Sequence, residues 1–189
     1  IMANQDAAFG LKAIGKVGQN RDNQGLSEYS IAANATAIYQ GDPVEMLATG
    51  TIGVAAAGDT LLLGPLTGVF YTDASTSKPT WANHLNASNT ATDIVGFVSD
   101  DPYERFEIQS DGATAVADVG LNADIVYAAG SSPDYVSKVE LQTSDQKAGT
   151  AQLRIMGISK DPSNDTAGSA NVNLVVMINE HFLKGTVGI

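Results

Sequence analysis

A series of short β-prone runs, each ended by turn-forming residues, restricts the fold of this chain more than any other feature of its sequence. Residues 28–31, 43–47 and 68–71 are three of these runs, and Gly, Asp and Pro stand between them. The runs recur about every 8 to 12 residues, which is typical of a β-sandwich or a β-barrel. No long segment has the apolar period that an amphipathic helix requires. The sequence therefore predicts an all-β fold consisting of a single antiparallel β-sandwich or β-barrel.

Three segments in the second half of the chain indicate further strands. Residues 105–108 and 152–155 alternate polar with apolar side chains, as half-buried strands with one solvated face do. Residues 171–178 alternate at first and then become continuously apolar, which indicates a strand that enters the core or a subunit contact. Asp111-Gly112 is the strongest hairpin signal, and it predicts that the runs on either side of it pair with each other.

The first thirty residues differ in charge and in texture from the rest of the chain. Their basic residues are Lys12, Lys16 and Arg21, whereas the chain as a whole is strongly acidic. Four glycines interrupt any helical period here, so we expect an extended segment. The predicted organisation is an extended N-terminal arm over residues 1–30 and a β-domain over residues 31–189 that folds without it. The apolar anchors of the arm are Phe9, Leu11, Ile14 and Val17.

Composition excludes several classes of partner. The chain has 10 Lys and Arg against 21 Asp and Glu, a formal net charge of −11, so it repels phosphate backbones and anionic lipids. No apolar run reaches the roughly 18 to 20 residues of a membrane span. We therefore expect neither nucleic acid nor membrane as a partner. Charged residues are only 16% of the chain, which leaves small polar side chains suited to packing against other proteins.

No group of residues in the sequence predicts catalysis. Asp100 and Asp101 are adjacent carboxylates, but Pro102 follows them, and this pattern is typical of a turn at the end of a strand. His84 and His181 are far apart in the sequence, and neither belongs to a metal-binding motif. The chain also lacks cysteine and the glycine-rich loops that hold phosphates. We therefore expect a protein that is not an enzyme and that uses no cofactor or metal ion.

Several stretches of the chain, taken together and in this order, resemble a known family. They are Met2-Ala-Asn-Gln-Asp-Ala-Ala-Phe-Gly10, Ala37-Ile-Tyr-Gln-Gly-Asp-Pro-Val44, Asp100-Asp-Pro-Tyr103 and Val176-Met-Ile-Asn-Glu-His-Phe182. The family consists of small structural proteins of tailed bacteriophages, especially marine and cyanobacterial ones, that are thought to decorate or cement the capsid. The likeness lies in the order and spacing of these strings, because none of them is a chemical motif.

This resemblance implies a virion structural protein on the outer surface of an icosahedral capsid, made in the host cytoplasm. Such a protein clamps neighbouring subunits of the major capsid protein, often as a homotrimer. Among the folds of this class, a β-tulip barrel and a jelly-roll sandwich both suit the chain. The arm would cover the capsid surface, with apolar anchors and with cations that meet acidic capsid groups. The predicted capsid contacts are Phe9, Leu11, Lys12, Ile14, Lys16 and Arg21.

A second hypothesis is a carbohydrate- or protein-binding β-module of a virion or of a bacterial surface. Its site would be the loop predicted over residues 75–89, which contains the only tryptophan, Trp81. An aromatic side chain in a loop can contact a ligand, but it can equally pack as an apolar plug. The sequence leaves these two roles of Trp81 open.

Overall fold

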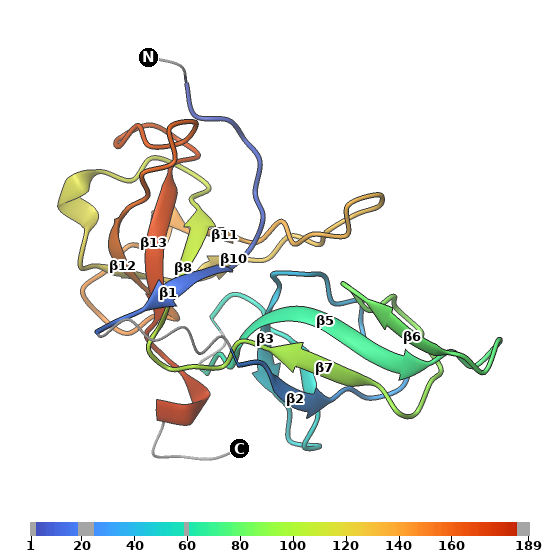
Figure 1. Ribbon diagram of the computed structural model, residues 1–189. Coiled ribbons are helices and arrows are strands. Elements are labelled where there is room, and N and C mark those ends of the chain that lie inside the picture. The colour runs from blue at the N-terminus through green and yellow to red at the C-terminus, as the bar shows by residue number, and fades with distance from the viewer. Residues whose placement is uncertain (1–2, 19–24, 59–60, 185–189) are drawn as a thin grey trace.

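The computed structural model describes residues 3–18, 25–58 and 61–184. Its strands form two main sheets in which paired strands run antiparallel, and the helical elements of these ranges are short 3-10 turns (Figure 1). The prediction of an all-β, antiparallel fold is confirmed. In the same ranges, no helix is long and apolar enough to cross a membrane.

The first sheet has five strands in the order β1-β8-β13-β12-β9, so that β1 and β9 are its edges. The strands are β1 (Lys12–Lys16), β8 (Glu104–Gln109), β9 (Asn122–Ala123), β12 (Leu153–Ile158) and β13 (Asn173–Ile178). Buried and more exposed side chains alternate along most of β8, β12 and β13, so one face of the sheet carries a core and the other faces solvent. The polar and apolar alternation at residues 105–108 and 152–155 predicted these strands correctly.

The second sheet has six strands in the order β2-β7-β5-β3-β4, and β6 pairs with β5 beside this path. The strands are β2 (Ser27–Ser30), β3 (Pro43–Met46), β4 (Ile52–Val54), β5 (Gly64–Thr72), β6 (Pro79–Ala82) and β7 (Val95–Val98). The smaller elements are β10 (Ile125–Val126), β11 (Glu140–Leu141), η1 (Val116–Asp118), η2 (Thr143–Asp145) and η3 (Phe182–Lys184).

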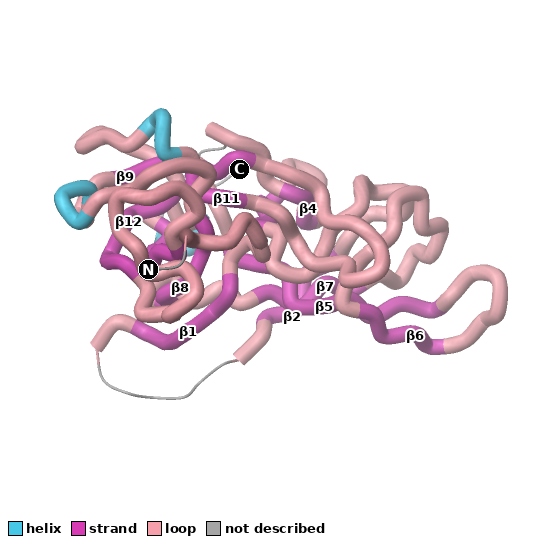
Figure 2. Tube along the Cα trace, turned by 90° about the horizontal axis from the view of Figure 1, so that it is seen from above, coloured by secondary structure: helices cyan, strands magenta, loops and turns pink. Residues whose placement is uncertain are grey.

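Buried apolar side chains form two clusters, one against each main sheet. Phe106 and Val176 belong to the cluster of the first sheet, and Leu66 and Val98 belong to that of the second. Removal of apolar area from water contributes roughly 25 cal/mol per Å² and is the main stabilising term in each cluster. The two sheets lie side by side, with β6 at the end of the molecule far from β1 (Figure 2).

The N-terminal segment is built into both sheets. Within residues 1–30, β1 pairs with β8 in the first sheet and β2 pairs with β7 in the second. Leu11, directly before β1, is only 2% exposed and packs in the first core cluster. Its amide donates a hydrogen bond of 2.9 Å to the carbonyl oxygen of Gly41, just ahead of β3. The extended backbone expected here therefore lies on the chain's own sheets.

Replacing Gly10 by Ala tests how closely this segment is seated. Gly10 has a φ of +72°, and a Cβ at this position would lie 2.4 Å from the Gly41 carbonyl oxygen and 2.5 Å from the Ser137 Cβ. We expect a loss of about 3 kcal/mol or more in the free energy of unfolding, because overpacking adds to the cost of the left-handed conformation. Urea denaturation measures this loss. Gly50→Ala is the control, since Gly50 has a φ of +77° but open space around it; equal losses in the two variants would contradict the close seating.

The hairpin predicted at Asp111-Gly112 does not form. β8 pairs with β1 and β13, not with the residues that follow this turn. The Asp111 carboxylate instead accepts hydrogen bonds from the amide and the hydroxyl of Thr143, at 2.8 and 2.7 Å. The pairing of β8 with distant strands and the contact of Asp111 with Thr143 therefore take precedence over the turn signal of Asp111-Gly112.

Candidate functional site

The solvent face of the first sheet carries an unusual concentration of positive charge. We call it the basic face and define it by the outward side chains of β1, β8, β12 and β13. These side chains are Lys12, Ile14, Arg105, Glu107, Arg154, Met156, Val175 and Met177. Three of the 10 Lys and Arg residues, Lys12, Arg105 and Arg154, thus lie on one face of a chain whose net charge is −11. The strand alternation that buries Phe106 and Ile155 is what turns Arg105 and Arg154 outward.

A row of three side chains crosses the middle of the basic face. Met177 on β13 is paired with Arg105 on β8 and with Arg154 on β12, so two guanidinium groups flank one thioether. Arg154 is held in place by Asn122 and Asn179, whose side-chain oxygens accept its hydrogen bonds at 3.0 and 2.6 Å. This arrangement presents two oriented cations around an apolar centre, which suits contact with an acidic protein surface.

Two acidic side chains on or beside the first sheet are already engaged within the chain. Glu107 accepts a hydrogen bond from the Ser159 hydroxyl, and Asp101 forms a salt bridge with Lys16. The hydrogen bond with Asp101 raises the pKa of Lys16, and the same bond lowers the pKa of Asp101. Lys16 therefore stays charged, but part of its charge is satisfied within the chain. Lys12, Arg105 and Arg154 are the cations most available to a partner.

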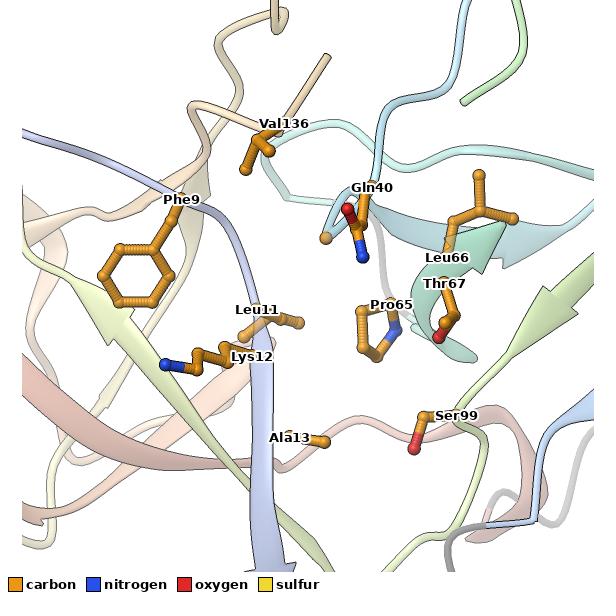
Figure 3. Close-up of a pocket in the computed structure, with 11 residues that line it drawn as sticks. Phe9, Leu11, Lys12, Ala13, Gln40, Pro65, Leu66, Thr67, Ser99 and Val136 are labelled. Carbon is orange, nitrogen blue, oxygen red and sulfur yellow. The ribbon is translucent and has the colours of Figure 1, made fainter. Parts of the chain in front are cut away.

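A groove runs beside β1 between the two sheets and has a volume of about 290 Å³. Figure 3 shows the N-terminal segment along one side of it and the start of β5 along the other. The labelled side chains are Phe9, Leu11, Lys12, Ala13, Gln40, Pro65, Leu66, Thr67, Ser99 and Val136. Most of this lining is apolar. Because β1 is an edge strand, the groove and the basic face together form one continuous surface around it.

A buried carboxylate lies next to this groove. Asp42 follows Gly41, has no exposed surface, and accepts a hydrogen bond of 2.8 Å from the amide of Tyr39. Burial raises the pKa of Asp42 to about 6, although this hydrogen bond acts in the opposite direction. The folded protein therefore binds a proton at Asp42 more tightly than the unfolded chain does.

The Asp42→Asn variant tests how much this proton contributes to the free energy of unfolding. Because the pKa of Asp42 is higher in the folded state, its contribution to stability is greatest below the unfolded pKa and is lost as pH rises through about 6. Asn does not titrate, so the stability of the variant relative to the wild type should improve by about 2 kcal/mol from pH 4.5 to pH 8. Thermal or urea unfolding at the two pH values measures this difference. A difference that does not change with pH would show that Asp42 titrates alike in both states.

The structure places the predicted contact residues in different surroundings. Leu11 is buried in the first core, and Phe9 is partly buried beside the groove. Ile14, at 44% exposure, and Lys12 are open to solvent on the basic face. Arg21 lies outside the described residues. Of the predicted set, Lys12 and Ile14 are the ones that the structure brings together on this face. Lys16 is the cross-strand partner of buried Glu104, so it lies on the other face of the sheet, where it contacts Asp101.

The sequence did not predict that Arg105 and Arg154 share the basic face with Lys12. The sequence predicts half-solvated strands around Arg105 and Arg154, but nothing in it shows that β8 and β12 flank the same strand, β13. The alternation of polar and apolar residues was the available signal. It predicts that each Arg faces solvent, and only the strand order shows that both face the same side.

Trp81 lies on a strand and not in a loop. It belongs to β6, at the solvent side of the second sheet, and 55% of its surface is exposed. Its ring packs on Phe97 with the ring centroids 4.8 Å apart. The predicted position of this residue in a loop is therefore wrong, because β6 pairs with β5 and extends the sheet.

The adjacent carboxylates of Asp100 and Asp101 both accept hydrogen bonds from other residues of the chain. Asp100 accepts hydrogen bonds from the hydroxyls of Ser27 and Tyr29, at 2.9 and 2.6 Å. Asp101 accepts one from the amide of Tyr103 in addition to its contact with Lys16. In the part of the chain that the structure describes, no group of three or more His, Asp or Glu side chains is arranged to hold a metal ion.

Comparisons of the chain with protein-family models, with curated proteins and with solved structures found no match.

Proposed function

We propose that this chain is a non-enzymatic decoration, or cement, protein that binds the outer surface of a phage capsid. The observation that carries the proposal is the basic face on a strongly acidic chain. Charges of one sign gathered on one face favour a partner of the opposite sign and fix the orientation of binding. The likeness of residues 2–10, 37–44, 100–103 and 176–182 to phage structural proteins supports the major capsid protein as that partner.

In this proposal the basic face lies against acidic groups of the capsid. Lys12, Arg105 and Arg154 supply the charge, and Met156 and Met177 supply apolar contact area between them. A cement must add contact across the joint between neighbouring subunits, and an edge strand with a groove beside it offers a second point of contact there. We further propose a homotrimer, because three linked basic faces bind far more tightly than one.

Co-sedimentation tests this function. Shells assembled from the major capsid protein of the phage that encodes the chain are mixed with the purified protein and pelleted. We expect saturable binding that weakens as the salt concentration is raised, since exposed charges are screened within about 8 Å at physiological ionic strength. A protein that stays in the supernatant at every ratio of protein to shell would refute the decoration role.

A further inference from the structure

A second exposed cluster lies on the other sheet, far from the basic face. Its members are Phe70 on β5, Trp81 on β6 and Phe97 on β7, and we call it the aromatic platform. Trp81 is 55% exposed and Phe70 is 41% exposed. Phe70 is the cross-strand partner of Trp81, so these rings project from the same face of the sheet. Exposed aromatic rings clustered on one face indicate a binding surface.

The indole of Trp81 packs closely over Gly68 on β5. A Cβ on Gly68, the cross-strand partner of Phe97, would lie 2.6 Å from Cζ2 and 3.2 Å from Cε2 of Trp81. The ring therefore occupies the space that a side chain at position 68 would take. Gly68 does not have a positive φ, so its backbone does not require glycine. The absence of a side chain at Gly68 makes room for the indole, and 55% of the surface of Trp81 stays exposed to solvent.

Polar but not cationic groups border the aromatic platform. Glu28 on β2 is the cross-strand partner of Phe97, and Ser30 is the partner of Val95. Both are exposed, and no described residue forms a hydrogen bond or an ion pair with the Glu28 side chain. The four strands β2, β5, β6 and β7 contain no Lys or Arg. The platform thus offers ring faces together with oxygen atoms that accept hydrogen bonds.

We propose that the aromatic platform binds a neutral oligosaccharide. The C–H face of a hexopyranose ring can pack on the indole of Trp81, while hydroxyl groups of the next residues donate to Glu28 and Ser30. An anionic glycan or lipid finds no cation on these strands and meets the charge of the acidic chain. A cationic ligand can also pack on an indole, so the arginine-rich peptide is included in the test below as the competing ligand. Binding of an oligosaccharide goes beyond capsid binding, and it uses the second sheet, whereas the basic face belongs to the first.

Trp81 is the only tryptophan of the chain, so its fluorescence reports on this site alone. Neutral hexasaccharides of glucose, galactose and N-acetylglucosamine are titrated against the full-length protein. We expect at least one of them to shift or quench the emission saturably. Gly68→Ala keeps the fluorophore but displaces the indole, and Glu28→Gln removes the carboxylate charge. We expect about tenfold weaker binding in the first variant and a smaller loss in the second, with the far-ultraviolet dichroism unchanged.

Controls separate this proposal from the capsid function. Lys12→Ala lies on the basic face and should leave sugar binding unchanged, and Trp81→Ala should leave co-sedimentation with shells unchanged. An emission that responds to none of the sugars, or to an arginine-rich peptide instead, would overturn the proposal. It would also be overturned if Trp81→Ala changed the mass of the protein in solution, because the platform would then be a contact between copies of the chain.

Discussion

Replacing Leu11 by Ala should lower the free energy of unfolding by about 2 to 5 kcal/mol. Leu11 is 2% exposed and packs in the core of the first sheet, so a smaller side chain leaves a cavity there. Deleting residues 1–18 removes β1 as well as this anchor and exposes the edge of β8. We expect the shortened chain not to unfold cooperatively. Urea denaturation followed by circular dichroism measures both effects.

Ile14→Ala is the matched control for Leu11→Ala. Ile14 is three residues further along the same segment, but it is 44% exposed on the basic face. Surface substitutions of this kind change stability by about 0.5 kcal/mol or less. If Leu11→Ala were as mild as Ile14→Ala, or if the chain without residues 1–18 unfolded like the intact one, the segment would be a separable arm, as the sequence predicts.

Reversing two charges of the basic face should weaken binding to shells by about 100-fold. The double variant Lys12→Glu with Arg105→Glu places two carboxylates where the proposal requires cations. A loss of roughly 1.4 kcal/mol for each reversed charge corresponds to a factor of ten each. Both side chains are exposed, so the fold should tolerate the changes. The amount of protein that pellets with shells, measured over a range of concentrations, gives the ratio of dissociation constants.

Lys78→Glu with Lys138→Glu provides the matched control for this experiment. Both lysines are exposed and lie outside the basic face, and their reversal changes the net charge by the same amount. This variant should bind shells within about threefold of the wild type, because distant surface charges are screened. Equal losses in the two double variants would mean that overall charge, and not the basic face, governs binding.

Local patterns predicted the class of fold and the orientation of single strands. The alternation around Phe106 and Ile155 gave β8 and β12 together with the correct solvated side chains. The lack of a helical period correctly predicted an all-β chain. These features depend on residues that are neighbours in sequence, which is why the sequence alone sufficed for them.

Features that depend on long-range pairing could not be predicted in this way. The glycines of the N-terminal segment predict extended backbone, but only the fold shows that Gly41 and Ser137 approach Gly10 too closely for a side chain there. The division of the buried side chains into two clusters likewise follows from strand order. Asp111-Gly112 misled for the same reason, since the partners of β8 are distant in sequence.

The candidate site was predicted only in part, for the same physical reason. Lys12 and Ile14 lie two residues apart on one strand, so their shared face is visible in the sequence. The irregular register between Ala13 and Gly15, which turns Lys16 to the other face, is not. Arg105 and Arg154 join Lys12 and Ile14 only because β13 lies between β8 and β12. The seating of Trp81 on Gly68 also requires the pairing of β5 with its neighbours on both sides.

A reconstruction of decorated shells by electron cryomicroscopy tests the central claim most directly. Shells saturated with the wild-type protein would show which face of the chain lies against the capsid. We predict that the solvent face of β1, β8, β13 and β12 is turned inward, with Arg105 and Arg154 next to acidic groups of the major capsid protein. A map in which this face points to solvent, or in which shells carry no added density, would contradict the account.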